Sequence, residues 1–225
     1  MNARGVFVTG TDTGVGKTRA SVALLHAQRG LGRRAVGMKP VASGCRVAHG
    51  ELRNEDTEAL IAASSPTPPY ALSNPFALPL AIAPHIAARD AGVEIAIGPI
   101  VAAYRELAAT ADRIVVEGVG GWSVPLSDTL MQADLVRALD LPVVLVVGLR
   151  LGCINHALLT ARAILADGCA LSGWIANRID PAMSHADLNI ETLRTRIAAP
   201  LLGVIAHGAD AGDDAAALAH WARAA

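Results

Sequence analysis

Lysine is the scarcest charged residue in this sequence. Of the 19 basic residues in the 225-residue chain, 17 are arginines and two are lysines, Lys17 and Lys39. A surface lysine in so arginine-rich a sequence is replaceable at little cost, whereas a compact ammonium beside a phosphate is not. We therefore treat both lysines as candidate phosphate-binding residues, against the alternative that they are incidental surface lysines.

The sequence also lacks an excess of charge of either sign. Its formal net charge at pH 7 is -1, so no broad basic surface is expected to attract nucleic acid or anionic lipid. The cysteines, Cys45, Cys153 and Cys169, cannot all pair within the chain, and none has the Cys-x-x-Cys spacing of a zinc or dithiol site. We expect reduced thiols and no nucleic-acid partner.

Long apolar segments are missing as well. An apolar stretch begins within a few residues of Met1, which is expected to leave no room for the charged, apolar and cleavage regions of a signal peptide. No apolar run approaches the length needed to cross a membrane. Together with the cysteines, these features predict a cytoplasmic protein without a membrane partner.

What the sequence does contain is a series of short, continuous apolar runs separated by alanine-rich segments with helical spacing. Continuous apolar strands are buried on both faces, so the pattern predicts an α/β fold, a doubly wound, mainly parallel sheet with helices on both faces. A chain of this length fits a single domain, 1–225. The predicted strands are 6–8, 35–38, 114–116, 142–147, 171–176 and 201–205. The predicted helices are 17–30, 55–63, 82–89, 100–110, 132–139, 154–166, 185–197 and 214–223. The proline-rich segment 64–84 is predicted to be a long surface loop.

The first predicted strand is followed by Gly-Thr-Asp-Thr-Gly-Val-Gly-Lys-Thr at residues 10–18 and then by a helix. A P-loop requires this strand, loop and helix context, so we predict a P-loop NTPase fold rather than an incidental glycine-rich turn. The backbone N–H groups of 13–18 would surround an anion, while Lys17 reaches the β and γ phosphates and Thr18 binds Mg²⁺. Five residues instead of four separate Gly10 from Gly16, so the loop departs slightly from the usual motif. The predicted nucleotide contacts here are Thr13, Gly14, Val15, Gly16, Lys17, Thr18 and Arg19.

Polar residues follow the next predicted strands, at the edge where parallel sheets bind ligands. Lys39, followed by Pro40, is expected to act on the same phosphates as Lys17, and we expect Lys39→Ala to keep the fold but lose turnover. Glu117 is the candidate Mg²⁺ ligand, because the glycines after it permit close backbone approach. Asp56 is either a further oxygen ligand or part of an acidic helix start.

Two further strand ends carry candidate binding segments. After 142–147 comes the glycine-bearing entry to a helix at 152–155, whose free N–H groups are suited to a substrate carboxylate, whereas His156 is interpreted as an ordinary helix histidine. After 171–176 comes Asn177, whose amide either reads the edge of a nucleotide base or caps a turn.

Taken together, these motifs resemble those of the dethiobiotin synthetase family. The resemblance runs from Thr9 to about Gly203, and several separate motifs in one order are more specific than a P-loop alone. The matching segments are 10–18, Lys-Pro-Val-Ala-Ser-Gly at 39–44, Glu-Gly-Val-Gly-Gly at 117–121, Gly-Cys-Ile-Asn-His at 152–156 and Pro-Leu-Leu-Gly at 200–203.

The resemblance implies an ATP-dependent ligase that uses Mg²⁺. Members of the family bind 7,8-diaminopelargonate and carbon dioxide, phosphorylate the carbamate from ATP and close a cyclic urea. By position, Lys17 and Lys39 are catalytic, Thr18, Asp56 and Glu117 hold the metal, and Ser43 contacts the diamine. A homodimer is implied, in which Gly152, Cys153, Ile154 and Asn155 bind the substrate carboxylate in the partner subunit. The remaining nucleotide contacts implied are Gly118, Val119, Gly120, Asn177, Arg178, Ala206, His207 and Gly208.

Three positions depart from the family pattern and bear on nucleotide preference and carboxylate affinity. Gly14 stands where related proteins often have glutamate, 206–208 replaces a Pro-Trp-like base-contacting segment, and Leu188 replaces a tyrosine near the substrate tail. The alternative from another class is a P-loop switch ATPase of the partition or cell-division positioning type, which would have the same fold. Another amidoligase of the superfamily and a guanine-specific nucleotidase are weaker alternatives.

Overall fold

The computed structural model describes residues 5–48 and 50–224. At its centre is a six-stranded sheet with the order β10-β9-β8-β1-β7-β2, in which all neighbouring strands are parallel. The strands are β1 (Gly5–Gly10), β2 (Ala35–Met38), β7 (Arg113–Glu117), β8 (Val143–Gly148), β9 (Leu171–Asn177) and β10 (Leu201–Ile205). The predicted parallel α/β sheet is confirmed.

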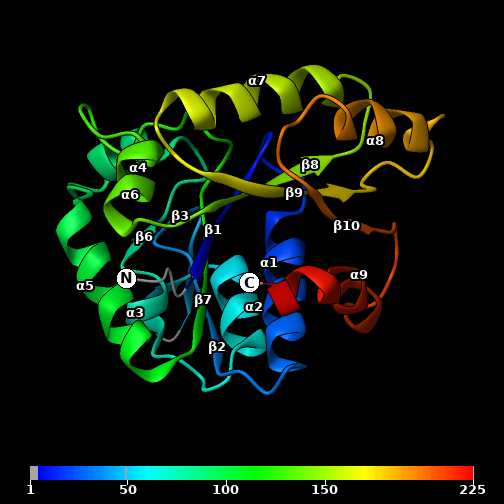
Figure 1. The fold of residues 1–225 in the computed structure, drawn as a ribbon. Coiled ribbons are helices and arrows are strands. Elements are labelled where there is room, and N and C mark those ends of the chain that lie inside the picture. The colour runs from blue at the N-terminus through cyan, green and yellow to red at the C-terminus, as the bar shows by residue number, and fades with distance from the viewer. Residues whose placement is uncertain (1–4, 49, 225) are drawn as a thin grey trace.

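Helices cover both faces of this sheet (Figure 1). One face packs against α1 (Lys17–Arg29), α2 (Glu55–Ala63) and α9 (Ala211–Ala224). The other face packs against α5 (Ile97–Thr110), α6 (Gln132–Leu139), α7 (Cys153–Ala166) and α8 (Ala186–Arg194). Helix α5 begins three residues before its predicted start, because Pro99 lies in the first turn, where proline is tolerated.

The central strands divide their side chains between two cores. In β8, Val143, Leu145 and Val147 pack into the core under α5 to α8, whereas Val144 and Val146 pack into the core under α1, α2 and α9. All six β8 residues are buried. This arrangement explains why the apolar runs are continuous in the sequence, since a strand covered on both faces has no polar side.

The proline-rich segment is more ordered than predicted, and the prediction of a surface loop was wrong in part. It contains α3 (Tyr70–Ser73) and β6 (Phe76–Leu78) and leads into α4 (Pro84–Asp90). Strand β6 pairs in parallel with β3 (Val41–Ser43). Pro69 and Pro75 directly precede α3 and β6, and Pro84 is the first residue of α4, so these prolines lie where no backbone N–H is needed.

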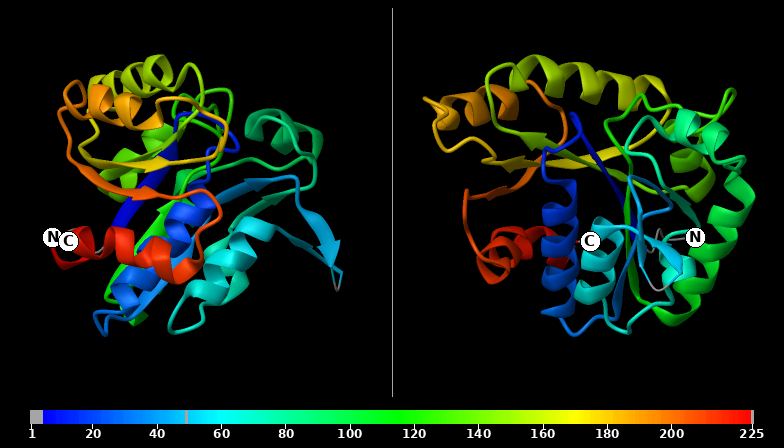
Figure 2. Two further views of the ribbon diagram at one scale, coloured as in Figure 1. Left: turned by 90° about the vertical axis from the view of Figure 1, so that its right-hand side faces the viewer. Right: turned by 180° about the vertical axis from the view of Figure 1, so that it is seen from behind.

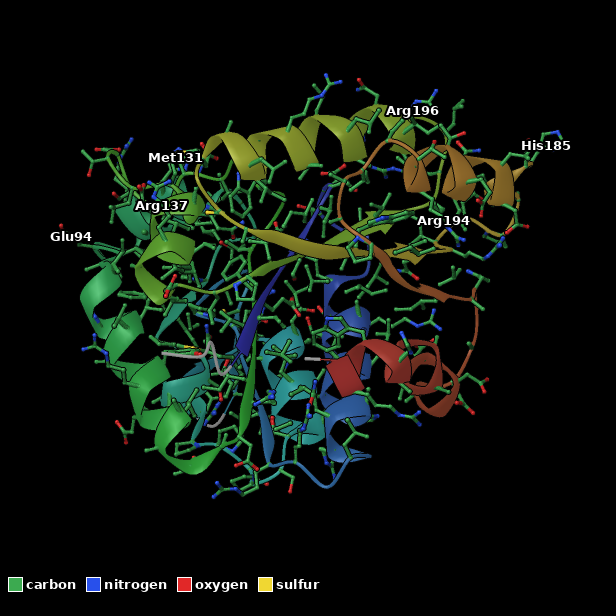
Figure 3. All side chains as sticks on the ribbon, in the orientation of Figure 1. Glu94, Met131, Arg137, His185, Arg194 and Arg196 are labelled. Atoms are coloured by element: carbon green, nitrogen blue, oxygen red, sulfur yellow. The ribbon has the colours of Figure 1, made fainter. Side chains whose placement is uncertain are left out.

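Two further features concern the surface of the protein, a hairpin and the positions of arginines. Strands β4 (Arg46–Ala48) and β5 (Glu51–Arg53) form an antiparallel hairpin that projects from the body in Figure 2. Arg137 on α6 and Arg194 on α8 lie on opposite sides of the molecule in Figure 3. In the described ranges, no helix combines the length and apolarity needed to cross a bilayer.

Candidate nucleotide site

The carboxyl ends of three adjacent strands bring the predicted phosphate-binding groups together. Strand β7 lies between β1 and β2, so Glu117 at its end lies between the loop after β1 and Lys39 after β2. The loop after β1 leads directly into α1, which begins at Lys17. Strands of a parallel sheet end at one edge, and this topology therefore gathers residues that are far apart in the sequence.

Gly16 shapes the loop at the start of α1. It adopts a left-handed conformation with φ of 87°, and a Cβ at this position would lie 2.0 Å from Nδ2 of Asn177. Any other residue would meet both backbone strain and a clash. With glycine as the N-cap, no side chain occupies the N–H groups of the first turn of α1, which remain available to an anion.

A buried ion cluster lies next to this loop. Nζ of Lys39 is 2.6 Å from Oε1 of Glu117 and 2.9 Å from Oδ2 of Asp56, and Oγ1 of Thr18 donates to Oε1 of Glu117 at 3.0 Å. Lys39 is 4% exposed and Glu117 is 0% exposed, so each charge depends on the other for compensation. The backbone N–H of Lys39 donates to the carbonyl of Ser73 at 2.7 Å, which joins the proline-rich segment to the residue after β2.

The pKa values of the two lysines shift in opposite directions, because their charged neighbours differ. Burial, followed by the positive charge of Lys39, lowers the pKa of Lys17 to about 8. Burial also opposes the charged form of Lys39, but Glu117 and Asp56 outweigh it and raise the pKa of that ammonium. Burial opposes ionisation of Asp56, yet Lys39 holds its pKa below the usual value. Lys17 is therefore the ammonium that an anionic ligand would stabilise most.

The cluster has free oxygen ligands of the kind that Mg²⁺ prefers. Oε2 of Glu117 is buried and has no hydrogen-bond partner among the residues that the structure describes. Asp56 and the Thr18 hydroxyl lie beside it. No group of three or more His, Cys, Asp or Glu side chains forms a metal cage within 5–48 and 50–224. Mg²⁺ is commonly held by one or two carboxylates together with substrate phosphates, so these residues fit it.

A cavity of about 760 Å³ opens beside the cluster and the P-loop. Ser43 lines it, and the Ser43 hydroxyl is buried without a partner in the described part of the chain. Part of the wall is apolar, and of its apolar residues only Val119 was predicted from the sequence, because isolated apolar residues carry no motif. The apolar lining residues are Ala81, Ile82, Ala83, Pro84, Val119, Val124 and Pro125.

A second cavity, of about 460 Å³, lies at the opposite edge of the sheet. Its lining includes the first residues of strands, such as Gly5 and Leu201, and none of the predicted site residues. Gly5 directly follows residues 1–4, which lie outside the described ranges. The chemistry expected from the sequence is thus concentrated in the larger cavity at the carboxyl edge.

The residues predicted to contact the nucleoside form a separate group at the tips of β9 and β10. Nδ2 of Asn177 donates to the carbonyl of Val15 at 2.9 Å, and its Oδ1 is buried and unpartnered among the described atoms. Arg178 pairs with Asp187, and Nδ1 of His207 lies 3.3 Å from the carbonyl of Arg178. Asn177 therefore links this group to the P-loop, although the group does not line the larger cavity.

The predicted carboxylate-binding segment 152–155 does not line the cavity of its own chain. Gly152 and Asn155 are exposed, whereas Cys153 is buried. Gly152 is left-handed with φ of 95° and begins α7 without a side-chain cap. Leu151 beside it is 97% exposed, and Leu188 on α8 is 63% exposed. Arg150 connects this segment to the P-loop, because its Nη2 lies 2.6 Å from Oδ2 of Asp12.

Known proteins similar to this chain establish its family. A family model described as an AAA domain matches residues 4–219. A protein of Xanthomonas euvesicatoria named ATP-dependent dethiobiotin synthetase BioD is 61% identical over 95% of both chains. A Xylella fastidiosa protein of the same name is 58% identical over 92% of both chains. The chain belongs to the dethiobiotin synthetase family. The resemblance expected from the motifs is thereby confirmed.

Solved structures similar to this one share its fold at low sequence identity. A MinC:MinD cell division complex from Aquifex aeolicus has a TM-score of 0.60 at 15% identity, covering 98% of this chain and 94% of that chain. A ParA family ATPase from Chlorobium tepidum has a TM-score of 0.57 at 12% identity, covering 97% and 98%. These likenesses show a P-loop NTPase fold and nothing finer, because a common fold hosts many functions.

Proposed function

We propose that the chain is an ATP-dependent dethiobiotin synthetase, a ligase that joins carbon dioxide to 7,8-diaminopelargonate and closes a cyclic urea. The observation that carries this proposal is the convergence of Lys17, Lys39 and Glu117 on a cavity that also contains the unpartnered hydroxyl of Ser43. The high identity to relatives of that name supports it. Residues 1–225 would act as one ligase domain, and the unpaired cysteines suit the reducing cytoplasm.

In the first part of the reaction, the nitrogen of one substrate amine bonds to carbon dioxide and releases a proton, which gives a carbamate. A carbamate oxygen then attacks the γ phosphorus of ATP, and the bond from that phosphorus to the bridging oxygen of ADP breaks. Lys17 and Lys39 would neutralise the charge that develops on the phosphoryl oxygens. Thr18, Asp56 and Glu117 would hold Mg²⁺, which supplies further neutralisation of the phosphates. The chain's main task is to position the two reactants.

In the second part, the other amine attacks the carbamoyl carbon and the bond to the phosphate oxygen breaks. The ring closes, phosphate leaves and the amine releases its proton. The Ser43 hydroxyl is suited to an amine or carbamate, because it lines the cavity without an internal partner. The apolar wall around Ile82 is suited to the alkyl chain of the diamine.

The substrate carboxylate requires a cation or free N–H groups. We infer that the first turn of α7, at 152–155, supplies N–H groups to the cavity of a second subunit in a homodimer. This inference is supported by the uncapped start of α7 and by the position of the segment outside its own cavity. Sedimentation of the purified protein would test it, since a monomer that is active at assay concentration contradicts it.

One assay tests the central proposal. Purified protein is incubated with 7,8-diaminopelargonate, bicarbonate and MgATP, and the products are separated by chromatography and mass spectrometry. We expect dethiobiotin and ADP in equal amounts, and no dethiobiotin when the diamine is left out. Release of ADP without dethiobiotin, together with nucleotide-dependent dimerisation, would instead support a switch ATPase.

A further inference from the structure

Arg19 lies next to the predicted phosphate site, and its guanidinium donates hydrogen bonds to one carboxylate and two carbonyls. It follows Thr18 in the first turn of α1, yet its guanidinium is bonded to the segment after β10. Its Nε donates to Oδ2 of Asp214 at 2.6 Å, and its Nη2 donates to Oδ1 of the same carboxylate at 2.9 Å. The same Nη2 also donates to the carbonyls of Ala206 at 2.9 Å and Ala209 at 2.8 Å.

These contacts fasten the segment 206–209 at both ends. Asp214 is 4% exposed, so its carboxylate depends on Arg19 for compensation. The backbone N–H of Asp214 donates to the carbonyl of Asp210 in the first turn of α9, so Asp214 itself is held in place by the helix that follows 206–209. The planar fork of an arginine can bind a carboxylate with two donors and still reach nearby carbonyls, whereas a lysine cannot make this pattern.

The fastened segment lies next to the group predicted to contact the nucleoside. The backbone N–H of Arg178 donates to the carbonyl of Ile205 at 3.0 Å, and the ring of His207 reaches the carbonyl of Arg178. Asn177 in the same group has a buried, unpartnered Oδ1. Residues 206–208 are exposed and belong to no helix or strand. Their position relative to α1, and so to the phosphate loop, therefore depends on Arg19.

We infer that Arg19 and Asp214 are positioning residues that hold 206–209 as one wall of the nucleobase site. They would set nucleotide affinity and base preference without touching the nucleotide. The inference rests on the proposed function for the identity of the nucleotide. It refines the expected nucleotide contact of Arg19, because its guanidinium is already engaged by a carboxylate and two carbonyls.

The experiment compares Arg19→Ala, Asp214→Asn and the double variant with the parent chain. The matched control is Arg29→Ala, because Arg29 lies on the same helix and its Nη1 donates to the carbonyl of Ala63 at 3.0 Å, away from 206–209. We expect the KM for ATP to rise about tenfold, or about 1.4 kcal/mol, in each test variant. The double variant should lose no more than either single one, because both residues belong to one network.

Several readouts distinguish a positioning role of Arg19 and Asp214 from a general loss of activity. The KM for the diamine and kcat should stay at parent values, and the preference for ATP over CTP should decrease. Arg19→Lys keeps the charge pair with Asp214 but loses the fork that reaches the two carbonyls, so its KM for ATP should lie between those of the parent and Arg19→Ala. If Arg19→Ala does not fold, a KM for ATP in Arg19→Lys equal to that of the parent overturns the inference. An unchanged KM for ATP would overturn the inference. It would also be overturned if the KM values for ATP and for the diamine both rose while the preference for ATP over CTP stayed the same.

Equilibrium binding keeps this result independent of the reaction. Binding of a fluorescent ADP analogue should weaken in the test variants and stay unchanged in Arg29→Ala. If the parent chain binds the analogue but makes no dethiobiotin, the proposed function fails while the role of Arg19 is still measured. If the test variants bind it as tightly as the parent does, the role of Arg19 fails and the proposed function stands.

Discussion

Replacing Lys39 with methionine removes one charge from a buried cluster and nearly preserves the length of the side chain. In the parent chain the Lys39 ammonium faces the fully buried Glu117 at 2.6 Å. Sequence reasoning predicted that loss of this lysine leaves the fold intact. The burial of the pair leads to a different expectation, because the variant retains a buried carboxylate without its cation.

The size of the effect follows from the burial of the pair. Breaking a buried ion pair by removing one partner typically costs about 3 to 5 kcal/mol. Thr18 still donates to Glu117, which keeps the cost near the lower end of this range. We expect the variant to lose about 3 kcal/mol in its free energy of unfolding.

Urea denaturation of both proteins measures this loss. The double variant Lys39→Met/Glu117→Gln is the control. It should be more stable than Lys39→Met, because it no longer buries a carboxylate without its cation.

Turnover provides the second readout of the same variants. Both should lose at least about 100-fold in kcat, because a charge that stabilises the transferring phosphoryl group is absent. A double variant that is no more stable than Lys39→Met would refute the dependence of Glu117 on Lys39. Near-normal kcat in Lys39→Met would refute its catalytic role.

Three further predictions concern single residues of the site. Gly16→Ala should abolish ADP binding in a fluorescence titration, because the new Cβ would lie 2.0 Å from Nδ2 of Asn177 at a φ of 87°, whereas Gly98→Ala, which meets open space, should bind normally. ADP binding without metal should weaken about tenfold between pH 7 and pH 9, because Lys17 has a pKa of about 8 and only its charged form attracts phosphate; binding that is constant over this range contradicts the lowered pKa. Ser43→Ala should raise the KM for the diamine but not for ATP, since its unpartnered hydroxyl lines the cavity, and an equal rise for both would argue against direct contact.

The sequence alone determined the class of fold and the main chemical groups of the site. Continuous apolar runs require strands that are covered on both faces, and this is what β8 shows. The P-loop at 10–18 is a local motif, so its conformation follows from glycines and a helix start that are close together in the sequence. Lys39 and Glu117 were found because both follow strands and strand ends share one edge of a parallel sheet.

Only the tertiary structure decided which of these groups meet and how deeply they are buried. The order β1-β7-β2 brings Glu117 to Lys39 across 78 positions of sequence, and the closing of the fold brings Arg19 to Asp214 across 195. The apolar cavity wall around Ile82 likewise has no pattern of its own. Spacing along a chain encodes local conformation, whereas contacts between distant segments arise only when the whole sheet and its helices pack together.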